Sequence, residues 1–463
     1  MRIDAPTVAT DPVRTLRRLD EIQADALWIV YHDYAGLGRA KAVGRERFED
    51  VARRGVTFAM ANWDLAITDH QVPYPIFGAD SGDFRAVPDP DRIVALPHRP
   101  GVAQAFTRLA DDLGRPWPGD PRALLARQVE RLAELGLAAT VAFEAEFVLA
   151  LPGDPGSLLR DRSRMFAVDE LDARWAFGRG LLDALAGAGV AVHQYAKEYG
   201  PGQFEVSLLP AAPLPAADRF LLLRQLAKAV ARDLGWVASF MPKPFAELPG
   251  NGLHVHLGLV DAASGDDAAA DPANLRALSP RGRAAIAGLL AHARAQAALA
   301  APTPTSYKRL LPGSWAPAHV CWAFGNRAAL VRIPGPGDAR HLEYRSGDGS
   351  MNPYLHLTGL LAAIADGLAL GDEPPPEATL DVGHLADREA TAAGFPRLPD
   401  TLSVALDALE ADPVLLDALG PIVPDHYLAV KRFEIDSYRE GSGAEETEVS
   451  VTDWERATYF GVV

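Results

Sequence analysis

Polar side chains alternate with apolar ones in several stretches of the chain, and this pattern predicts β-strands with one polar face. In "VAFEAEFVL" (141–149), Glu144 and Glu146 alternate with phenylalanine and alanine. In "GNGLHVHLGL" (250–259), His254 and His256 alternate with leucine and valine. Because successive side chains of a strand point to opposite faces, each of these pairs shares one side of its strand.

Three further stretches follow the same rule and add carboxylates, an imidazole and guanidinium groups. In "YAKEYGPGQFEVSLL" (195–209), Glu198 precedes a Gly-Pro-Gly turn, and Gln203, Glu205 and Ser207 alternate with apolar residues after it. "RHLEYRSGD" (340–348) and "NRAALVRIP" (326–334) present on their polar faces His341, Glu343, Arg345 and Arg332.

Any one of these strands, taken singly, is explained by a polar face that lies in water. The set favours another interpretation, because such faces usually mix lysine, threonine, serine and arginine, whereas these carry carboxylate, imidazole and guanidinium groups with Gly-rich turns beside them. If the strands line one cavity, five carboxylates and an imidazole converge, and cations are needed to offset their repulsion. Oxygen-rich clusters with one imidazole suit Mg²⁺ or Mn²⁺, so we predict two or more such ions in the cavity.

Helical periodicity places helices near 14–23, 120–136, 171–189, 216–234 and 280–300, with strand-like segments between them. Residues 80–97 read as strand and turn, with Pro88 and Pro90 as interruptions. We predict an α+β fold, with a small N-terminal sheet domain over residues 1–112. A large domain of strands and helices then occupies residues 113–463.

The amino-acid composition limits the kinds of molecule that the protein is expected to bind and the cellular compartment in which it is expected to occur. The 463 residues carry a net charge of −16 and no block of Lys or Arg, which argues against nucleic acid or an anionic membrane as partner. Cys321 is the single cysteine, so no intramolecular disulfide is possible and a reducing cytosol is expected. Neither a signal peptide nor an uncharged apolar run of about 18 residues is evident, so we expect a soluble cytoplasmic protein.

Arginines near the polar strands point to phosphate chemistry. Two metal ions with an arginine set are what phosphoryl transfer requires, since charge spreads over the transferring oxygens. No Walker-type loop is present, so the chain is not expected to be a P-loop enzyme. The alternative for each arginine is a surface ion pair. The residues concerned are Arg309, Arg327, Arg332 and Arg345.

Seven motifs in one order make the chain resemble the glutamine synthetase family from about residue 20 almost to its end. They are "FEAEF", "GPGQFE", "FMPKPF…GNGLHVH", "YKRLLPG", "NRAALVRIP", "EYR" and "MNPYL". The resemblance implies a β-grasp-like N-terminal domain and a C-terminal catalytic domain built on an antiparallel β funnel. It also implies a ring-shaped homo-oligomer, commonly a dodecamer, with active sites between subunits. The implied chemistry phosphorylates the γ-carboxylate of L-glutamate with ATP and then displaces phosphate with an amine.

The resemblance also assigns roles to individual positions. Glu146, Glu198 and Glu205 are similar to ligands of the metal on the glutamate side, and Glu144, His254 and Glu343 to ligands of the metal on the ATP side. Gly250 and Arg309 are similar to groups that hold the glutamate main chain, and Arg327 and Arg345 to glutamate-binding and catalytic groups near the transferring phosphoryl. The ATP-binding positions are His256, Arg332 and His341. Asp33 in "YHDYAG" matches the aspartate that a neighbouring subunit contributes to ammonium binding.

Three departures from the family pattern affect the expected specificity and regulation. The family loop Pro-Gly-Tyr-Glu-Ala-Pro reads Pro-Gly-Ser314-Trp315-Ala-Pro here, so the carboxylate that deprotonates ammonium is absent. His341 replaces an arginine two residues before Glu343, which puts one nucleotide contact in doubt. Residues 378–400 contain no tyrosine that could be adenylylated.

These features leave several functions to be compared. The preferred hypothesis is a γ-glutamyl-amide ligase that uses an organic amine, because an indole at position 315 suits a carbon-bearing cation better than ammonium. The alternatives are an ordinary glutamine synthetase in which Trp315 only packs the loop shut, and a catalytically silent relative with a structural or regulatory role. A guanidino-phosphate kinase would share the metal and arginine chemistry but not "FEAEF" and "GPGQFE" together.

Overall fold

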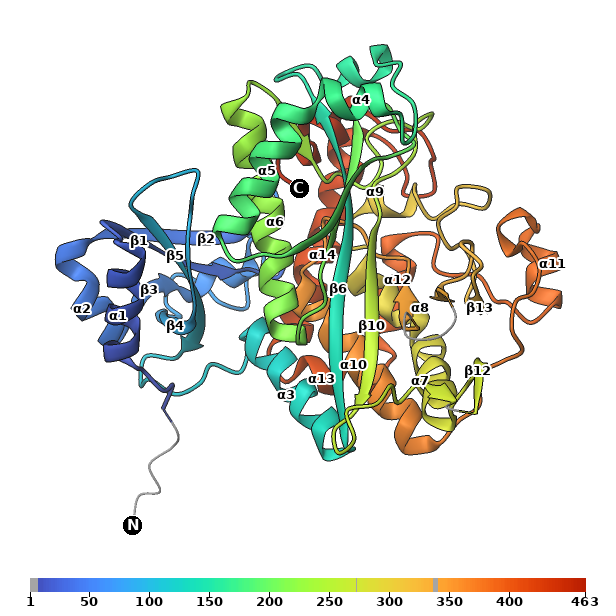
Figure 1. Cartoon of the computed structure of the whole chain (residues 1–463), viewed down its shortest axis with the longest axis horizontal. Coiled ribbons are helices and arrows are strands. Elements are labelled where there is room, and N and C mark those ends of the chain that lie inside the picture. The colour runs from blue at the N-terminus through green and yellow to red at the C-terminus, as the bar shows by residue number, and fades with distance from the viewer. Residues whose placement is uncertain (1–6, 272, 336–339) are drawn as a thin grey trace.

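The computed structural model of the chain describes residues 7–271, 273–335 and 340–463, so residues 1–6 of the predicted first domain lie outside it. An N-terminal sheet lies at one end of the long axis, and a larger domain with the long strands β6 and β10 forms the rest (Figure 1). The smaller sheet has the strand order β2-β1-β5-β4-β3, in which β1 and β5 pair in parallel. Its strands are β1 (Ala26–His32), β2 (Gly38–Gly44), β3 (Val56–Ala59), β4 (Asp83–Ala95) and β5 (Val102–Ala110).

The large domain is built on a second sheet with the order β13-β14-β15-β10-β6-β8-β7, and β9 also pairs with β6. All its neighbouring strands are antiparallel except β13 and β14, which pair in parallel. A small hairpin, β11 and β12, lies apart from it. The strands of the domain are β6 (Leu137–Ala150), β7 (Val192–Lys197), β8 (Gln203–Leu208), β9 (Val237–Ser239), β10 (Leu253–Asp261), β11 (Ala270–Asp271), β12 (Asn274–Leu278), β13 (Trp322–Phe324), β14 (Val331–Ile333) and β15 (Leu342–Tyr344).

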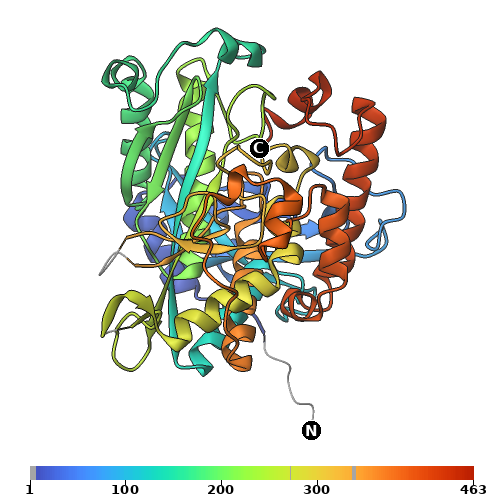
Figure 2. The ribbon, with the colours of Figure 1, turned by 90° about the vertical axis from the view of Figure 1, so that its right-hand side faces the viewer.

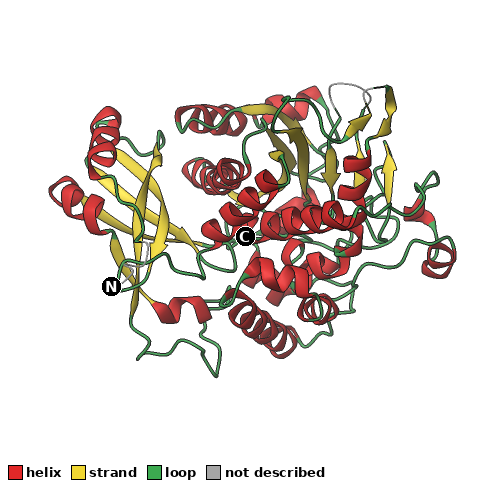
Figure 3. Ribbon diagram, turned by 90° about the horizontal axis from the view of Figure 1, so that it is seen from below, coloured by secondary structure: helices red, strands yellow, loops and turns green. Residues whose placement is uncertain are grey.

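Helices separate the two groups of strands, as the view from below shows (Figure 3). The long strands of the large sheet run along one side of the molecule, and the C-terminal helices lie on the other (Figure 2). The helices are α1 (Pro12–Ile22), α2 (Phe48–Arg54), α3 (Pro121–Glu134), α4 (Val168–Ala173), α5 (Trp175–Gly187), α6 (Pro213–Asp233), α7 (Pro280–Ala291), α8 (Ala293–Ala300), α9 (Pro304–Tyr307), α10 (Pro353–Leu370), α11 (Asp387–Ala392), α12 (Leu402–Glu410), α13 (Pro413–Leu419), α14 (Val423–Ser442) and α15 (Asp453–Tyr459).

Helix α10 is the central helix of the large domain. Its side chains are apolar nearly all round, which is typical of a helix enclosed on every side. Within the described residues it is the one helix long and apolar enough to cross a membrane, but 78% of that window is buried inside the protein. Asn352 caps its N-terminus by accepting hydrogen bonds from the backbone N–H groups of Tyr354 and Leu355. We therefore describe α10 as a core helix.

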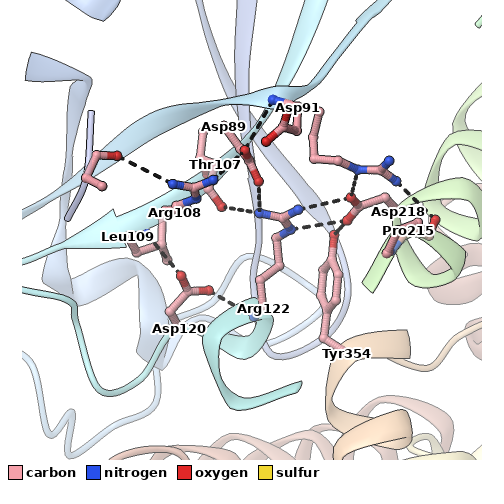
Figure 4. A network of polar contacts seen from close by, with 12 residues as sticks. Asp89, Asp91, Thr107, Arg108, Leu109, Asp120, Arg122, Pro215, Asp218 and Tyr354 are labelled. Atoms are coloured by element: carbon pink, nitrogen blue, oxygen red, sulfur yellow. Dashed lines mark hydrogen bonds and ion pairs between the residues drawn. The ribbon is translucent and has the colours of Figure 1, made fainter. Parts of the chain in front are cut away.

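A buried polar network joins the N-terminal sheet to three helices of the large domain (Figure 4). The Arg122 guanidinium, at the start of α3, donates to Asp218 of α6 at 3.0 Å and to Asp89 of β4 at 3.3 Å. Asp218 also accepts from Arg92 at 2.6 Å and from the Tyr354 hydroxyl at 2.5 Å. Because the charges are paired and multiply hydrogen-bonded, their burial is tolerated, and the network fixes the two sheets relative to each other.

The predicted α+β class, with an N-terminal sheet domain and a catalytic-type domain around a curved sheet, is confirmed. One local expectation is wrong: residues 83–95 form the single strand β4 despite Pro88 and Pro90. The pairing of β4 with β5 shifts register between Pro88 and Ile93, so the prolines fall at an irregularity where a ladder donor is not required. The predicted domain boundary near residue 112 falls between β5 and α3 and stays a prediction.

Candidate functional site

The strands with polar faces are neighbours in the large sheet. Glu144 of β6 pairs with His254 of β10, and Glu146 pairs with Glu205 of β8. Glu343 of β15 pairs with His256 and, on its other side, with Arg332 of β14. Paired residues of adjacent strands project to the same face. The sheet register therefore brings the carboxylates, imidazoles and arginines of five separate sequence stretches together.

Glu144, His254 and Glu343 form a compact group suited to a divalent cation. One ligand atom from each lies within 4.8 Å of the others, and among the described residues no other group of three acids, histidines or cysteines meets this criterion. His254 Nδ1 is 2.9 Å from Glu144 Oε1 and 3.7 Å from Glu343 Oε1. Burial acts to raise the pKa of Glu144, but the hydrogen bond from His254 and the nearby His256 imidazole lower it well below its usual range.

Two of the predicted phosphate-binding arginines contact this group directly. Arg332 Nη1 lies 2.6 Å from Glu343 Oε2, and Arg345 pairs with the other oxygen of the same carboxylate. Burial acts to raise the pKa of Glu343, but the charge of Arg345 and the neighbouring cationic groups lower it to about 2. The Glu343 carboxylate is therefore ionised, and each of its oxygens is paired with an arginine.

Glu146, Glu198 and Glu205, the second predicted trio, form an acidic region beside the first. Burial, followed by the charges of Glu144, Glu146 and Glu198, raises the pKa of Glu205 to about 10. Burial and the charge of Glu146 raise the pKa of Glu198 to about 6. Carboxylates repel one another in this way until a cation balances them, so this donor set fits a hard divalent ion.

The segment before β10 ties the acidic region to Arg309. The Gly252 N–H donates to Glu146 Oε2 at 2.7 Å, and Gln203 Nε2 donates to the Gly250 carbonyl at 2.9 Å. A Cβ at Gly250 would lie 2.6 Å from Cγ of Arg309, so only glycine allows this close approach. Arg309 Nη2 donates to the carbonyls of Ser346 and Gly347, both at 2.7 Å. Gly250 and Arg309 thus lie side by side, and their assignment to the glutamate main chain stays a prediction.

Gln203 also donates to Glu146, at 3.3 Å, and to Asn251 Oδ1, at 3.0 Å. The alternating pattern places this residue on the polar face of its strand but indicates no role for it. The structure identifies it as the link between the Glu146 carboxylate and the Gly250 turn. The signal that could have revealed this role is the amide itself, a neutral donor among four acids, which can hold carboxylates in place without adding charge.

The loop that contains Ser314 and Trp315 presents the indole outward. Ser314 Oγ donates to the carbonyl of Arg309 at 2.8 Å, which anchors the loop to the preceding segment. Trp315 has a φ of 60° and a side chain that is 68% exposed. A positive φ is unfavourable for a bulky residue, so the backbone at this position is strained. Within this chain the indole does not pack the loop shut.

His256 and His341 form a pair of imidazoles at the edge of the site. His256 Nδ1 is 2.7 Å from His341 Nε2, and His256 Nε2 is 3.5 Å from Glu144 Oε2. Arg340 is buried on the opposite face, where it donates to the carbonyl of Ala277, as strand alternation predicts. His341 therefore occupies the position of the missing arginine on the functional face, and Arg340 does not replace it.

Asp33 and Arg327 do not join the cluster within this single chain. Asp33 lies in the N-terminal domain with 2% exposure, and its carboxylate accepts from Arg39 Nε at 2.8 Å and from the Leu37 N–H at 2.9 Å. Burial raises the pKa of Asp33 in spite of Arg39. Arg327 is exposed in the loop between β13 and β14, and its carbonyl accepts from Arg345 Nε at 3.0 Å. Their predicted roles stay predictions.

Comparison with known proteins places this site in a described family. A family model described as glutamine synthetase, catalytic domain, matches residues 118–459. Glutamine synthetase of Thermus thermophilus is 37% identical over 82% of this chain and 83% of its own length. Glutamate–methylamine ligase of Methyloversatilis universalis is 32% identical over 97% of this chain and 99% of its own length. The solved GmaS/ADP complex in its first conformation has a TM-score of 0.82 and 32% identity, and it covers 97% of this chain and 99% of its own.

Proposed function

Since the chain belongs to the glutamine synthetase family and is an ATP-dependent glutamate ligase, we propose that it joins the γ-carboxylate of L-glutamate to an organic amine. The observation that supports this choice of amine is the exposed Trp315, which replaces the acidic loop residue expected for ammonium use. An indole face attracts cations and also makes favourable apolar contacts with carbon atoms, whereas ammonium has charge but no carbon to contact. The similarity to glutamate–methylamine ligase over nearly the full length favours the same class of nucleophile.

In this proposal the two acidic trios hold two Mg²⁺ or Mn²⁺ ions. Glu144, His254 and Glu343 bind the ion on the ATP side, and Glu146, Glu198 and Glu205 the ion on the glutamate side. The ions supply charge that screens the phosphates of ATP and the glutamate γ-carboxylate from each other. Arg332, His256 and His341 then bind the nucleotide, and Gly250 and Arg309 bind the main chain of glutamate.

The reaction proceeds in two balanced steps. A γ-carboxylate oxygen of glutamate attacks the terminal phosphorus of ATP, and ADP leaves with the electrons of the broken P–O bond. Arg327 and Arg345 stabilise the charge on the transferring oxygens. The amine nitrogen then attacks the acyl carbon, phosphate leaves, and the amine loses a proton. Without a loop carboxylate, Asp33 of a neighbouring subunit, a phosphate oxygen or water accepts that proton.

The alternative is an ordinary glutamine synthetase, and the relatives of that name among the similar proteins favour it. In that case Trp315 would be a neutral replacement. A silent relative is disfavoured because all six predicted metal positions carry ligand side chains. We further propose that the active enzyme is a cytoplasmic ring-shaped homo-oligomer with sites between subunits, because Asp33 can serve a site only if it belongs to a neighbour.

A phosphate-release assay with ATP, glutamate and a panel of amines tests the proposal. The panel contains ammonium, methylamine, longer monoamines, an alkanolamine, a polyamine and an arylamine. We expect at least one carbon-bearing amine to give a higher kcat/KM than ammonium, with the γ-glutamyl amide confirmed by mass. Preference for ammonium over every organic amine would establish the alternative. Glu146→Ala and Glu205→Ala, expected to be folded but inactive, serve as blanks for contaminating ATPase.

A further inference from the structure

Two further imidazoles, His256 and His341, lie beside the group formed by Glu144, His254 and Glu343. Neither is one of the three predicted ligands of the ATP-side metal. Their rings lie 4.8 Å apart between centroids and are tilted by 59°. The 2.7 Å separation of His256 Nδ1 and His341 Nε2 is that of a hydrogen bond, so one ring donates and the other accepts. This bond fixes the orientation of the His256 ring and determines what its other nitrogen presents.

The other nitrogen, His256 Nε2, is buried and has no hydrogen-bond partner among the described residues. The nearest acidic atom is Glu144 Oε2 at 3.5 Å, which is longer than the 2.7–3.2 Å range typical of an N–H···O bond. Two ligand atoms that each lie about 2.1 Å from one ion are separated by about 3.0 Å at an octahedral angle and by about 3.4 Å at a tetrahedral angle. The observed 3.5 Å separation therefore leaves room for a cation between nitrogen and oxygen.

We propose that His341 is a positioning residue that makes His256 an additional nitrogen ligand of the ATP-side metal site, so that His256 serves the nucleotide through the metal instead of by direct contact. His341 accepts a hydrogen bond from His256 Nδ1–H, so that the lone pair of His256 Nε2 faces the Glu144 carboxylate. Imidazole binds Mn²⁺ only modestly, Co²⁺ more tightly and Mg²⁺ poorly, in the order expected for nitrogen donors. With His254 and His256 both directed at Glu144, the site selects imidazole-binding ions over Mg²⁺.

The inference rests on the metal assignment of the proposed function, and it concerns which ion the site prefers. Metal-bound histidines commonly donate their second nitrogen to a fixed partner, and loss of that partner typically costs about 10–100-fold in metal affinity. Here the partner is another histidine in place of the arginine of the family pattern. An arginine can only donate, so it cannot hold His256 in the tautomer that leaves Nε2 free.

The test is the binding of Co²⁺ and of Mg²⁺ to the full-length, nucleotide-free protein, measured by isothermal titration calorimetry. His341→Leu should weaken Co²⁺ binding by about 10–100-fold and change Mg²⁺ binding much less. His341→Gln, which keeps a hydrogen-bond acceptor at the same reach, should retain most of the Co²⁺ affinity. His256→Gln should show the same selective loss of Co²⁺ affinity as His341→Leu. If His341→Leu does not fold, the Co²⁺ and Mg²⁺ affinities of His256→Gln test the inference in its place. His384→Leu, at an exposed histidine, is the matched control.

Each outcome has a defined meaning. Equal loss of both ions in His341→Leu, or no loss, overturns the inference and leaves the metal assignment in place. A glutamine variant as weak as the leucine variant overturns the positioning role of the hydrogen bond. If the wild-type protein binds neither ion, the metal assignment and the inference both fail.

Discussion

Arg345 is nearly fully buried between the carbonyl of Arg327 and the carboxylate of Glu343. Its planar guanidinium donates to the two oxygen atoms from different nitrogens, Nε and Nη1, in a fixed geometry that the single nitrogen of a lysine ammonium does not reproduce. We expect Arg345→Lys to lower kcat/KM by at least about 10²-fold, since loss of one preorganised electrostatic contact typically costs that much. Arg179→Lys is the control, because the Arg179 side chain is 65% exposed and pairs with Asp183 on α5.

Steady-state kinetics with saturating metal make this comparison, with circular dichroism to confirm folding. A wild-type kcat/KM in Arg345→Lys would mean that the residue is a structural ion pair and has no part in phosphoryl transfer. The control must stay within about twofold of wild type, because exposed ion pairs contribute little.

The raised pKa values of Glu205 and Glu198 lead to a prediction of how the stability of the fold depends on pH when divalent ions are removed. A glutamate in the unfolded chain titrates near 4.5, whereas folding raises the pKa of Glu198 to about 6 and that of Glu205 to about 10. The folded state thus binds protons that the unfolded state has released, and its stability falls as pH rises from about 5 to 10. In chelator, Tm should decrease over this range, and Mg²⁺ should restore it most at high pH.

The matched variants for this experiment are Glu205→Gln and Glu130→Gln. Glutamine stays neutral, so Glu205→Gln should flatten the decrease in Tm with pH. Glu130 lies on the exposed face of α3, and its substitution should leave the curve unchanged. A wild-type Tm in chelator that is constant or increasing between pH 6 and 9 would show that these carboxylates do not repel one another as described.

At the scale of elements, the start of α10 connects the N-terminal domain to the site. Asn352 caps α10 and also donates to the carbonyl of Asp33 at 2.7 Å. Arg224 of α6 donates to the carbonyls of Gly36 and Gly349, which ties the same β1–β2 loop to the segment before α10. The position of the Asp33 loop therefore depends on the segment that follows β15 and its site residues.

We expect Asn352→Ala to lower the free energy of unfolding by about 1–2 kcal/mol and to reduce activity at temperatures where it is folded. Thr401→Ala removes a comparable cap from α12, where Thr401 Oγ1 accepts from the Val404 N–H at 3.2 Å. That control should lose similar stability without the loss of activity. Equal activity in the two variants, measured by urea unfolding and amide formation, would contradict a role for the Asp33 loop.

The alternation of polar and apolar residues was sufficient to predict strands β6, β8, β10, β14 and β15 and, within each strand, which side chains lie on the same face. It could not predict their order in the sheet, which depends on long-range pairing such as Glu343 with His256. It predicted strand within residues 80–97 but not that β4 continues through Pro88 and Pro90, which a register shift in the pairing with β5 accommodates. Local pattern fixes which side chains share a face, and tertiary pairing fixes which faces meet.

At the scale of the whole molecule, the Arg122 network holds the domains together. Arg122 is 7% exposed and Asp218 is fully buried, so removing the arginine leaves uncompensated charge in the interior. Arg122→Met should cost about 3–5 kcal/mol in urea unfolding. Arg99→Met, which breaks the exposed pair with Asp233, should cost no more than about 1 kcal/mol. Equal costs would mean that the network does not support the domain interface.

This network could not be predicted from the sequence. Arg92, Arg122 and Asp218 lie in three separate helices and strands, and nothing in their local patterns distinguishes them from surface charges. The same limit applies to Asp33, which the family motif identified but whose pairing with Arg39 depends on the folded β1–β2 hairpin. The structural role of a charged residue can be assigned only when its burial and its hydrogen-bond partners are known.

The substitution Trp315→Glu tests whether this loop position determines the choice of amine, with kcat/KM measured for ammonium and for the preferred organic amine in both proteins. Losing a positioned base typically costs about 10²–10⁴-fold, so returning a carboxylate should raise ammonium use and weaken the organic amine. Trp175→Glu, at another partly exposed tryptophan, should change neither value. The account predicts that the ratio of organic amine to ammonium falls by at least about tenfold in Trp315→Glu. A wild-type protein that already prefers ammonium, and a variant that changes neither number, would contradict it.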